Sequence, residues 1–304
     1  MKPLKIGLLD FGEVSHNLSV TNVIHNTITL IQKAEKYEFS RYWLGEHYGN
    51  WSAWGNPTTL IPILAGMTNK IKIGVAGIVL PLNGIMRAAQ DYKLLANLFP
   101  NRIELGLARG GATLGKFKYV EELISTDQFS QNFVNHFERV SKFFSVVSSE
   151  ICPPAIGLIP EIWILGANSE NSRQLLTQVR VNFSLSLFHR MNKPTALKIF
   201  SEIREFCAKE LGTVPQLNIA VAGVCNKSEN KVKTIINYGS HTSFLPNVYG
   251  SYNQMRDQIF DLIDLFKIDE IIYLDLCTSY DDRLHTCSLL KRVKSEFNEN
   301  QKNE

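Results

Sequence analysis

Paired cysteines are missing from this sequence of 304 residues, which has five cysteines, no CxxC motif and no cysteine spacing typical of a zinc site. An odd count in a chain of this size indicates reduced thiols and argues against a disulfide framework. The cysteine usage therefore favours a cytoplasmic protein.

An excess of charge of one sign is missing as well. The 32 Lys and Arg residues against 29 Asp and Glu residues give a formal net charge of +3, and the basic residues are dispersed along the chain. Nucleic acid and anionic lipid are bound by concentrated basic surfaces, so the composition argues against both partners. It favours a small molecule instead.

Long hydrophobic runs are also absent. The longest apolar stretch, residues 73–82, covers about ten residues, whereas a membrane helix needs about 20. The apolar segment near the amino terminus is interrupted by charge too early for the core of a signal peptide. We therefore expect a protein that is neither exported nor inserted in a membrane.

Several catalytic signatures are missing too: GxGxxG, the Walker loop, HExxH, GxSxG and the EF-hand loop. A Rossmann-type nicotinamide site, ATP hydrolysis and a serine nucleophile all lose support. The histidines outside the strand ends described below have no paired spacing for a metal ion, so we expect no metal site; they are His16, His25, His136, His241 and His285.

Short apolar runs rich in Ile, Leu and Val alternate with amphipathic helical patterns along the chain. Apolar strands covered by such helices are typical of a parallel sheet hidden on both faces, and eight strand–helix units close into a barrel. The sequence therefore predicts a single (β/α)8 (TIM) barrel over residues 1–297, followed by a polar, fraying tail over residues 298–304. The eight predicted strands are 4–9, 41–45, 71–76, 102–108, 161–166, 183–187, 217–224 and 270–276.

The clearest helical patterns cover residues 24–31, 85–95 and 255–266. The last one opens with Ser251 and Gln254, the reciprocal pattern of a capping box. An insertion over about 110–160 separates the fourth and fifth strands and contains a predicted helix at about 128–147 with phenylalanines along one side. Core packing is the usual role of such a stripe, with a lid or substrate pocket as the alternative.

The active site of a (β/α)8 barrel lies at the carboxyl ends of its strands, so polar residues there are the first candidates. A histidine at such a position titrates near neutrality and can act as a general base, and a neighbouring carboxylate can orient it. His47 and Glu46 form this pair; the alternative is a histidine bonded to a loop carbonyl. Further candidates follow other strands: Asp10, Arg109 and His189.

Arg109 precedes two glycines, which lets the backbone approach an anion that the guanidinium contacts. The turn at 166–172, which contains Asn168 and Ser169, leads from a strand into a helix, where free amide groups favour a phosphate. Together they predict a phosphate site. A structural salt bridge of Arg109 with Glu46 or Asp10 remains the alternative.

Several segments, in this order, resemble the bacterial luciferase-like family of flavin-dependent monooxygenases: 34–47, 73–81, 98–110, 160–166, and 250–251 followed by 268–270. The resemblance covers nearly the whole chain except about 112–158 and 225–249. It implies a (β/α)8 barrel that uses reduced FMN and O2 to oxidise a small organic substrate through a C4a-(hydro)peroxyflavin. It also implies a homodimer.

The resemblance carries over to individual residues. His47 matches the first histidine of the family's Glu-His-His, with Glu46 beside it, and Tyr48 replaces the second histidine. Ala76 and Gly77 fall where these enzymes can carry a non-proline cis peptide beneath the flavin ring. Arg109 matches the phosphate-contacting arginine, and Asn168 and Ser169 complete the phosphate site. Tyr48 and His189 are the expected substrate contacts.

Because no Rossmann motif offers an NADH site, we expect a separate flavin reductase to supply the reduced FMN. Two alternatives stay open. Some relatives use the deazaflavin F420 for hydride transfer, and Lys116 and Lys118 are then candidates to contact its anionic tail, although a solvated loop is the more usual role of such lysines. A barrel of this family can also serve as a noncatalytic flavin-binding or partner subunit, and Tyr48 leaves room for that.

Overall fold

The strands of the predicted barrel are present in the computed structural model of the chain, which describes residues 2–14, 18–49, 51–108, 110, 139, 143–144, 153–154, 156–166, 181–189, 191–240 and 244–303. The strands in these ranges are β1 (Lys5–Asp10), β2 (Arg41–Leu44), β3 (Lys72–Val79), β4 (Ile103–Ala108), β5 (Glu161–Leu165), β6 (Val181–Ser186), β7 (Leu217–Cys225), β8 (Val248–Gly250) and β9 (Glu270–Asp275).

Eight of the described strands close into a barrel with parallel pairing throughout. β1 pairs with β2 and β9, the strands from β2 to β7 pair in chain order, and β7 also pairs with β9. This confirms the predicted (β/α)8 barrel. β8, a three-residue strand that pairs in parallel with the end of β7, is not among the predicted strands.

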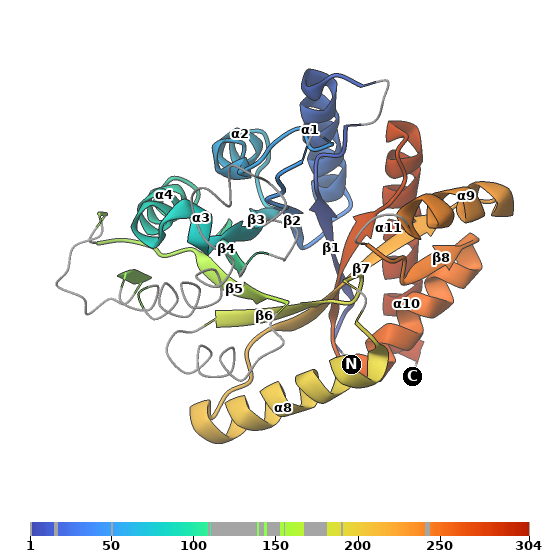
Figure 1. The fold of residues 1–304 in the computed structure, drawn as a ribbon. Coiled ribbons are helices and arrows are strands. Elements are labelled where there is room, and N and C mark those ends of the chain that lie inside the picture. Colours follow the sequence, from blue (N-terminus) through green and yellow to red (C-terminus); the bar gives the residue numbers. More distant parts are fainter. Residues whose placement is uncertain are drawn as a thin grey trace.

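Helices lie outside the strands, as Figure 1 shows. The described helices are α1 (Val20–Lys36), the 3-10 turn η1 (Pro57–Thr59), α2 (Ile61–Gly66), α3 (Leu80–Asn83), α4 (Ile85–Leu98), α8 (Lys193–Leu211), α9 (Glu229–Ser240), α10 (Tyr252–Phe266) and α11 (Tyr280–Asn303). None of the helices in the described ranges is long and apolar enough to cross a membrane.

The three clearest helical patterns are confirmed as α1, α4 and α10. At the start of α10 the Ser251 N–H donates to Gln254 Oε1 over 2.8 Å, which is one half of the predicted capping box. The predicted helix at 128–147 lies almost wholly outside the described residues, as does most of the insertion between β4 and β5. Phe144 is described there and is buried in the hydrophobic core.

The last helix continues through residues that the sequence analysis assigns to a fraying tail, since α11 ends at Asn303. Phe297 packs edge-on against Phe260 of α10 with their ring centroids 5.1 Å apart. At the next residue, the Asn298 Oδ1 atom accepts a hydrogen bond from the Leu4 N–H over 2.7 Å. These two contacts hold the final turns of α11 on the barrel, although most side chains there are polar.

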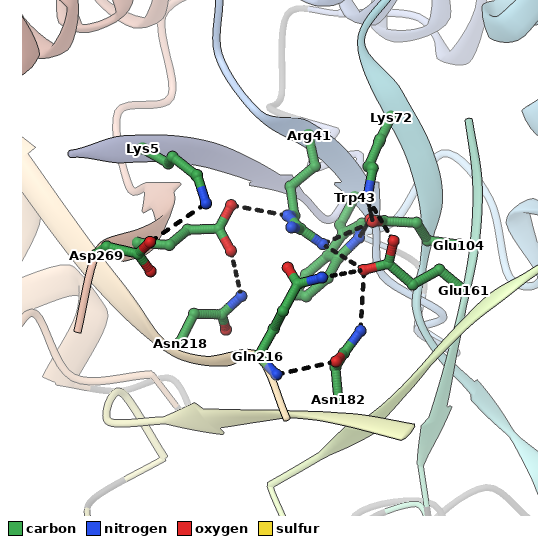
Figure 2. A network of polar contacts seen from close by, with 11 residues as sticks. Lys5, Arg41, Trp43, Lys72, Glu104, Glu161, Asn182, Gln216, Asn218 and Asp269 are labelled. Atoms are coloured by element: carbon green, nitrogen blue, oxygen red, sulfur yellow. Dashed lines mark hydrogen bonds and ion pairs between the residues drawn. The ribbon is translucent and has the colours of Figure 1, made fainter. Parts of the chain in front are cut away.

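A buried charged network closes the amino end of the barrel (Figure 2). Arg41, the first residue of β2, donates to Glu270 over 2.9 Å and to Glu104 over 2.6 Å, and Trp43 Nε1 donates to Glu104 over 2.6 Å. Burial raises the pKa of Glu104 to about 7, against the lowering effect of Arg41. The residues of this network lie at the amino ends of the strands. The carboxyl ends of the strands are therefore the place to look for a functional site.

Candidate active site

Aromatic rings from four separate segments meet at the carboxyl end of the barrel. We call this group the aromatic collar. Two of its members, Phe11 and Phe188, are buried, whereas His47, Trp51 and Phe244 are half-buried and His189 is exposed. Its members follow β1, β2 and β6 or precede β8: Phe11, His47, Trp51, Phe188, His189 and Phe244.

His47 lies edge-on to Phe11, with ring centroids 4.2 Å apart, and also contacts Trp51 at 5.4 Å and Phe244 at 5.8 Å. Gly45 makes this arrangement possible, because a Cβ there would overlap the Phe11 ring. Burial, with a smaller contribution from His189, lowers the pKa of His47 to about 4. The imidazole is therefore neutral at neutral pH and can accept a proton.

His189 joins the same collar through its neighbours. Its ring lies 4.6 Å from Phe188 and 5.5 Å from Phe244, centroid to centroid. Desolvation lowers the pKa of His189, even though part of its ring is exposed, because the surrounding rings displace much of its water. The structure thus brings together two sequence-predicted residues, His47 and His189, that are more than a hundred positions apart.

Glu46 is buried and faces the start of α3. Its carboxylate accepts hydrogen bonds from the Val79 N–H at 3.1 Å and from Asn83 Nδ2 at 2.9 and 3.0 Å. Burial raises the pKa of Glu46, and these hydrogen bonds together with one from Tyr48 oppose that rise. Glu46 therefore fastens the end of β2 to the end of β3, and through this it sets the position of His47.

Tyr48 also contacts the Glu46 carboxylate: its hydroxyl donates a hydrogen bond to Glu46 Oε1 over 2.5 Å. Its ring packs on Gly55, where a Cβ would lie only 3.1 Å from Tyr48 Cε1. The phenol that replaces the family's second histidine is thus part of the support of Glu46.

The peptide bond between Ala76 and Gly77 is cis, as the sequence resemblance predicts for this position. Ala76 is partly exposed and packs against the interior cluster that contains Phe11 and Phe188. Gly77 backs onto β4, where a Cβ would lie 2.6 Å from the backbone of Gly106. The small residues of β3 and β4 therefore allow close approach of the two strands at the site.

The predicted phosphate-binding residues Arg109, Asn168 and Ser169 lie outside the described residues. The glycines that flank them are described: Gly110 has φ +83° and Gly166 has φ +64°, backbone conformations that favour glycine. The alternative partners of Arg109 have other contacts, because Asp10 pairs with Arg283 at 3.0 Å and Glu46 with the groups named above. The phosphate site stays a prediction.

Sequence reasoning missed the aromatic residues of the site. Phe11 follows the end of β1 directly, so the rule that sites lie at strand ends was enough to find it. Phe244 precedes β8 in a stretch without hydrophobic periodicity. Its ring centroid lies 5.0 Å from that of Phe11 and 5.6 Å from that of Phe188. Only the closure of the barrel brings these rings together.

The described end of the site fits the ring system of a flavin or deazaflavin. A planar tricyclic ring needs a flat apolar surface, a small side chain beneath it and few charges. The aromatic collar supplies the surface, Ala76 supplies the small side chain, and the neutral His47 supplies a proton acceptor. No group of three or more metal-ligating side chains is found in the part of the chain that the structure describes.

Comparison with known proteins identifies the family. The family model described as luciferase-like monooxygenase matches residues 4–179, more than half of the chain. The chain therefore belongs to the luciferase-like monooxygenase family of enzymes. It is 21% identical to the uncharacterised Bacillus subtilis protein YwcH over 95% of this chain and 99% of that protein. It is 28% identical to a luciferase-like monooxygenase of Escherichia coli over 61% of this chain and 56% of that protein.

Solved structures share the fold. Apo-MsnO8 superposes with a TM-score of 0.79 at 19% identity, covering 95% of this chain and 98% of that one. The oxygenating constituent of a Pseudomonas putida 3,6-diketocamphane monooxygenase, in complex with FMN, gives 0.69 at 16% identity over 95% and 97%. An F420-dependent secondary alcohol dehydrogenase gives 0.72 at 13% identity over 96% and 98%. At these identities the likeness shows the barrel fold.

Proposed function

We propose that this chain is a flavin-dependent monooxygenase that uses reduced FMN and O2 to oxidise a small organic substrate. The observation that carries the proposal is the placement of His47: a neutral imidazole at the carboxyl end of the barrel, among aromatic rings and next to the strand that carries Ala76 and Gly77. Membership of a monooxygenase family supports the reaction type.

Reduced FMN, when bound, supplies the two electrons with which O2 is reduced, so that one oxygen atom enters the substrate and the other leaves as water. His47 is the base of the site, because its lowered pKa keeps it free to accept a proton released during oxygen transfer. Glu46 is a positioning residue that acts through Val79 and Asn83. The collar excludes water from the reacting atoms.

The remaining roles follow the sequence resemblance. Ala76 and Gly77 would support the flavin ring, and Arg109, with Asn168 and Ser169, would hold the FMN phosphate. His189 contacts the substrate, and Tyr48 acts on the same region through Glu46. A separate flavin reductase delivers the reduced cofactor, and the protein acts as a cytoplasmic homodimer.

Turnover with two reduced cofactors tests the proposal. Chemically reduced FMN and reduced F420 are each mixed with the protein, air and a panel of small organic compounds, and the products are identified by mass spectrometry. We expect oxidised products with FMN and none with F420. Turnover with F420 alone would overturn the choice of cofactor, and no turnover with either would favour a noncatalytic flavin-binding subunit.

A further inference from the structure

The aromatic collar has one member that contacts most of the others. The ring of Phe244 lies 5.0 Å from Phe11, 5.6 Å from Phe188, 5.5 Å from His189 and 5.8 Å from His47, centroid to centroid. Phe244, like Phe11, therefore contacts both the His47 ring at the β2 end and the Phe188 ring at the β6 end.

The backbone that follows Phe244 is fixed to the barrel. The Leu245 N–H donates to the Phe188 carbonyl over 2.9 Å, and the Asn247 N–H donates to the Ala222 carbonyl over 2.7 Å. The Asn247 side chain accepts in return from the Ala222 N–H over 3.1 Å. These bonds begin one residue after Phe244 and fix the chain on its carboxyl side.

This segment continues the edge of the barrel beyond β6. The Ala220 carbonyl accepts from the Leu187 N–H next to β6, and the Ala222 carbonyl, two residues on and on the same edge of β7, accepts from Asn247. Residues 245–250, including β8, therefore occupy the place above the end of β6. Phe244 stands at the start of this wall, beside His189.

The match to the family model ends before this wall. It covers residues 4–179, which include Phe11, His47 and Trp51, whereas Phe188, His189 and Phe244 come later in the chain. Three collar members thus lie within the matched residues, and the other three lie beyond them.

The chemistry of the collar selects against charge. Its described members are phenyl, indole and imidazole rings, and the pKa values of both imidazoles are lowered, so both are neutral at neutral pH. Moving a charged group into such surroundings without a partner is costly. Aromatic rings gain from edge-to-face and offset contacts beyond their buried area, which an aliphatic chain does not.

We infer that the substrate of this site is an uncharged aromatic compound whose ring packs on Phe244, and that Phe244 is the residue that determines this preference. The inference rests on the proposed function for the identity of the site, and it adds the substrate class.

Binding of three probes of similar size tests it: acetophenone, 2-octanone and 4-acetylbenzoate. Their dissociation constants are measured by ligand-detected NMR with the FMN-loaded protein, without turnover. We expect acetophenone to bind at least about threefold more tightly than 2-octanone, although the alkyl ketone has more apolar surface, and the benzoate to bind at least about tenfold more weakly. Equal or tighter binding of either competitor, or no binding of any probe, overturns the inference.

The variant Phe244→Leu keeps an apolar side chain and removes the ring. We expect it to weaken acetophenone binding about threefold to tenfold and to change 2-octanone binding by less than about twofold. Phe260→Leu is the matched control, because Phe260 is also half-buried in an edge-to-face pair but packs on Phe297 between helices. Equal losses for both ketones, or equal effects of the two variants, contradict the role of Phe244.

The outcomes also separate this inference from the proposed reaction. Selective acetophenone binding without any oxygenation by reduced FMN and O2 would leave the aromatic preference standing and contradict the proposed reaction. Oxygenation that prefers 2-octanone would support the reaction and overturn the aromatic preference.

Discussion

The Tyr48 hydroxyl donates a 2.5 Å hydrogen bond to Glu46 Oε1, which ties together two neighbouring residues of the β2 end. The same carboxylate accepts hydrogen bonds from Val79 at the end of β3 and from Asn83 at the end of α3. Tyr48, which by the sequence resemblance stands where the family has a second histidine, thus stabilises the buried Glu46. His47 is the imidazole next to the strand that carries the cis peptide.

Removing the Tyr48 hydroxyl tests this arrangement. We expect Tyr48→Phe to lower the free energy of unfolding by about 1–3 kcal/mol, because a buried carboxylate loses a donor. The loss also raises the pKa of Glu46 further, since this hydrogen bond opposes the effect of burial. Urea unfolding at pH 7 measures the change, with Tyr249→Phe at an exposed position as control. Equal stability of the two variants would contradict the role of Tyr48.

The lowered pKa of His47 makes stability depend on pH. In the unfolded chain the imidazole takes up a proton near pH 6.5, whereas in the folded protein it does so only near pH 4. The unfolded state therefore binds more protons in this window, and the contribution of His47 to stability is complete above about pH 6.5 and is lost as the pH falls through 4.

His47→Gln isolates this effect, because glutamine does not titrate. We expect the difference in unfolding free energy between wild type and variant to shrink by about 2 kcal/mol from pH 7.5 to pH 5. Urea unfolding at both pH values measures it, and the exposed His285 provides the control variant His285→Gln. A difference that stays constant with pH would show that His47 titrates normally.

Arg109 is predicted to hold the FMN phosphate. We expect Arg109→Ala to weaken FMN binding about tenfold to a hundredfold and riboflavin binding by less than about threefold, because only FMN loses a charge-assisted hydrogen bond. Flavin fluorescence titration measures both affinities. Arg87→Ala removes an exposed arginine that pairs with Asp91 and serves as control. The same loss for both flavins would rule out a phosphate contact.

Gly77 is required by the close approach of β3 and β4. A Cβ at this position would lie 2.6 Å from the carbonyl of Gly106, a backbone group that cannot turn away. We expect Gly77→Ala to lower the free energy of unfolding by about 1–3 kcal/mol. Gly66→Ala is the control, since a Cβ at the end of α2 meets nothing within 4 Å, and its expected effect is neutral or stabilising. Thermal unfolding of the two variants with equal midpoints would refute the packing argument.

The barrel was predictable because its signals are local. The nine residues of β7 are all buried, and they form a mostly apolar segment that can be recognised directly in the sequence. The strand β8 escaped because it has three residues with one, Val248, buried. The final turns of α11 escaped because two residues, Phe297 and Asn298, hold them on the barrel amid polar neighbours.

The site was predictable only in part for a related reason. His47, Glu46 and the cis peptide at Ala76 follow from strand ends and from the family resemblance. The collar depends on contacts such as that between Phe11 and Phe244, which are more than two hundred positions apart. No spacing in the sequence encodes such a contact, because it exists only once β1 and β8 lie in one sheet.

The most direct test of the central claim is the origin of the oxygen atom in the product. A single turnover with reduced FMN under ¹⁸O₂, followed by mass spectrometry, should give a product that carries one ¹⁸O atom. With His47→Gln the labelled product should form at least about a hundredfold more slowly, because the base is lost. A product without label from O2, or an unchanged rate in the variant, would contradict the account.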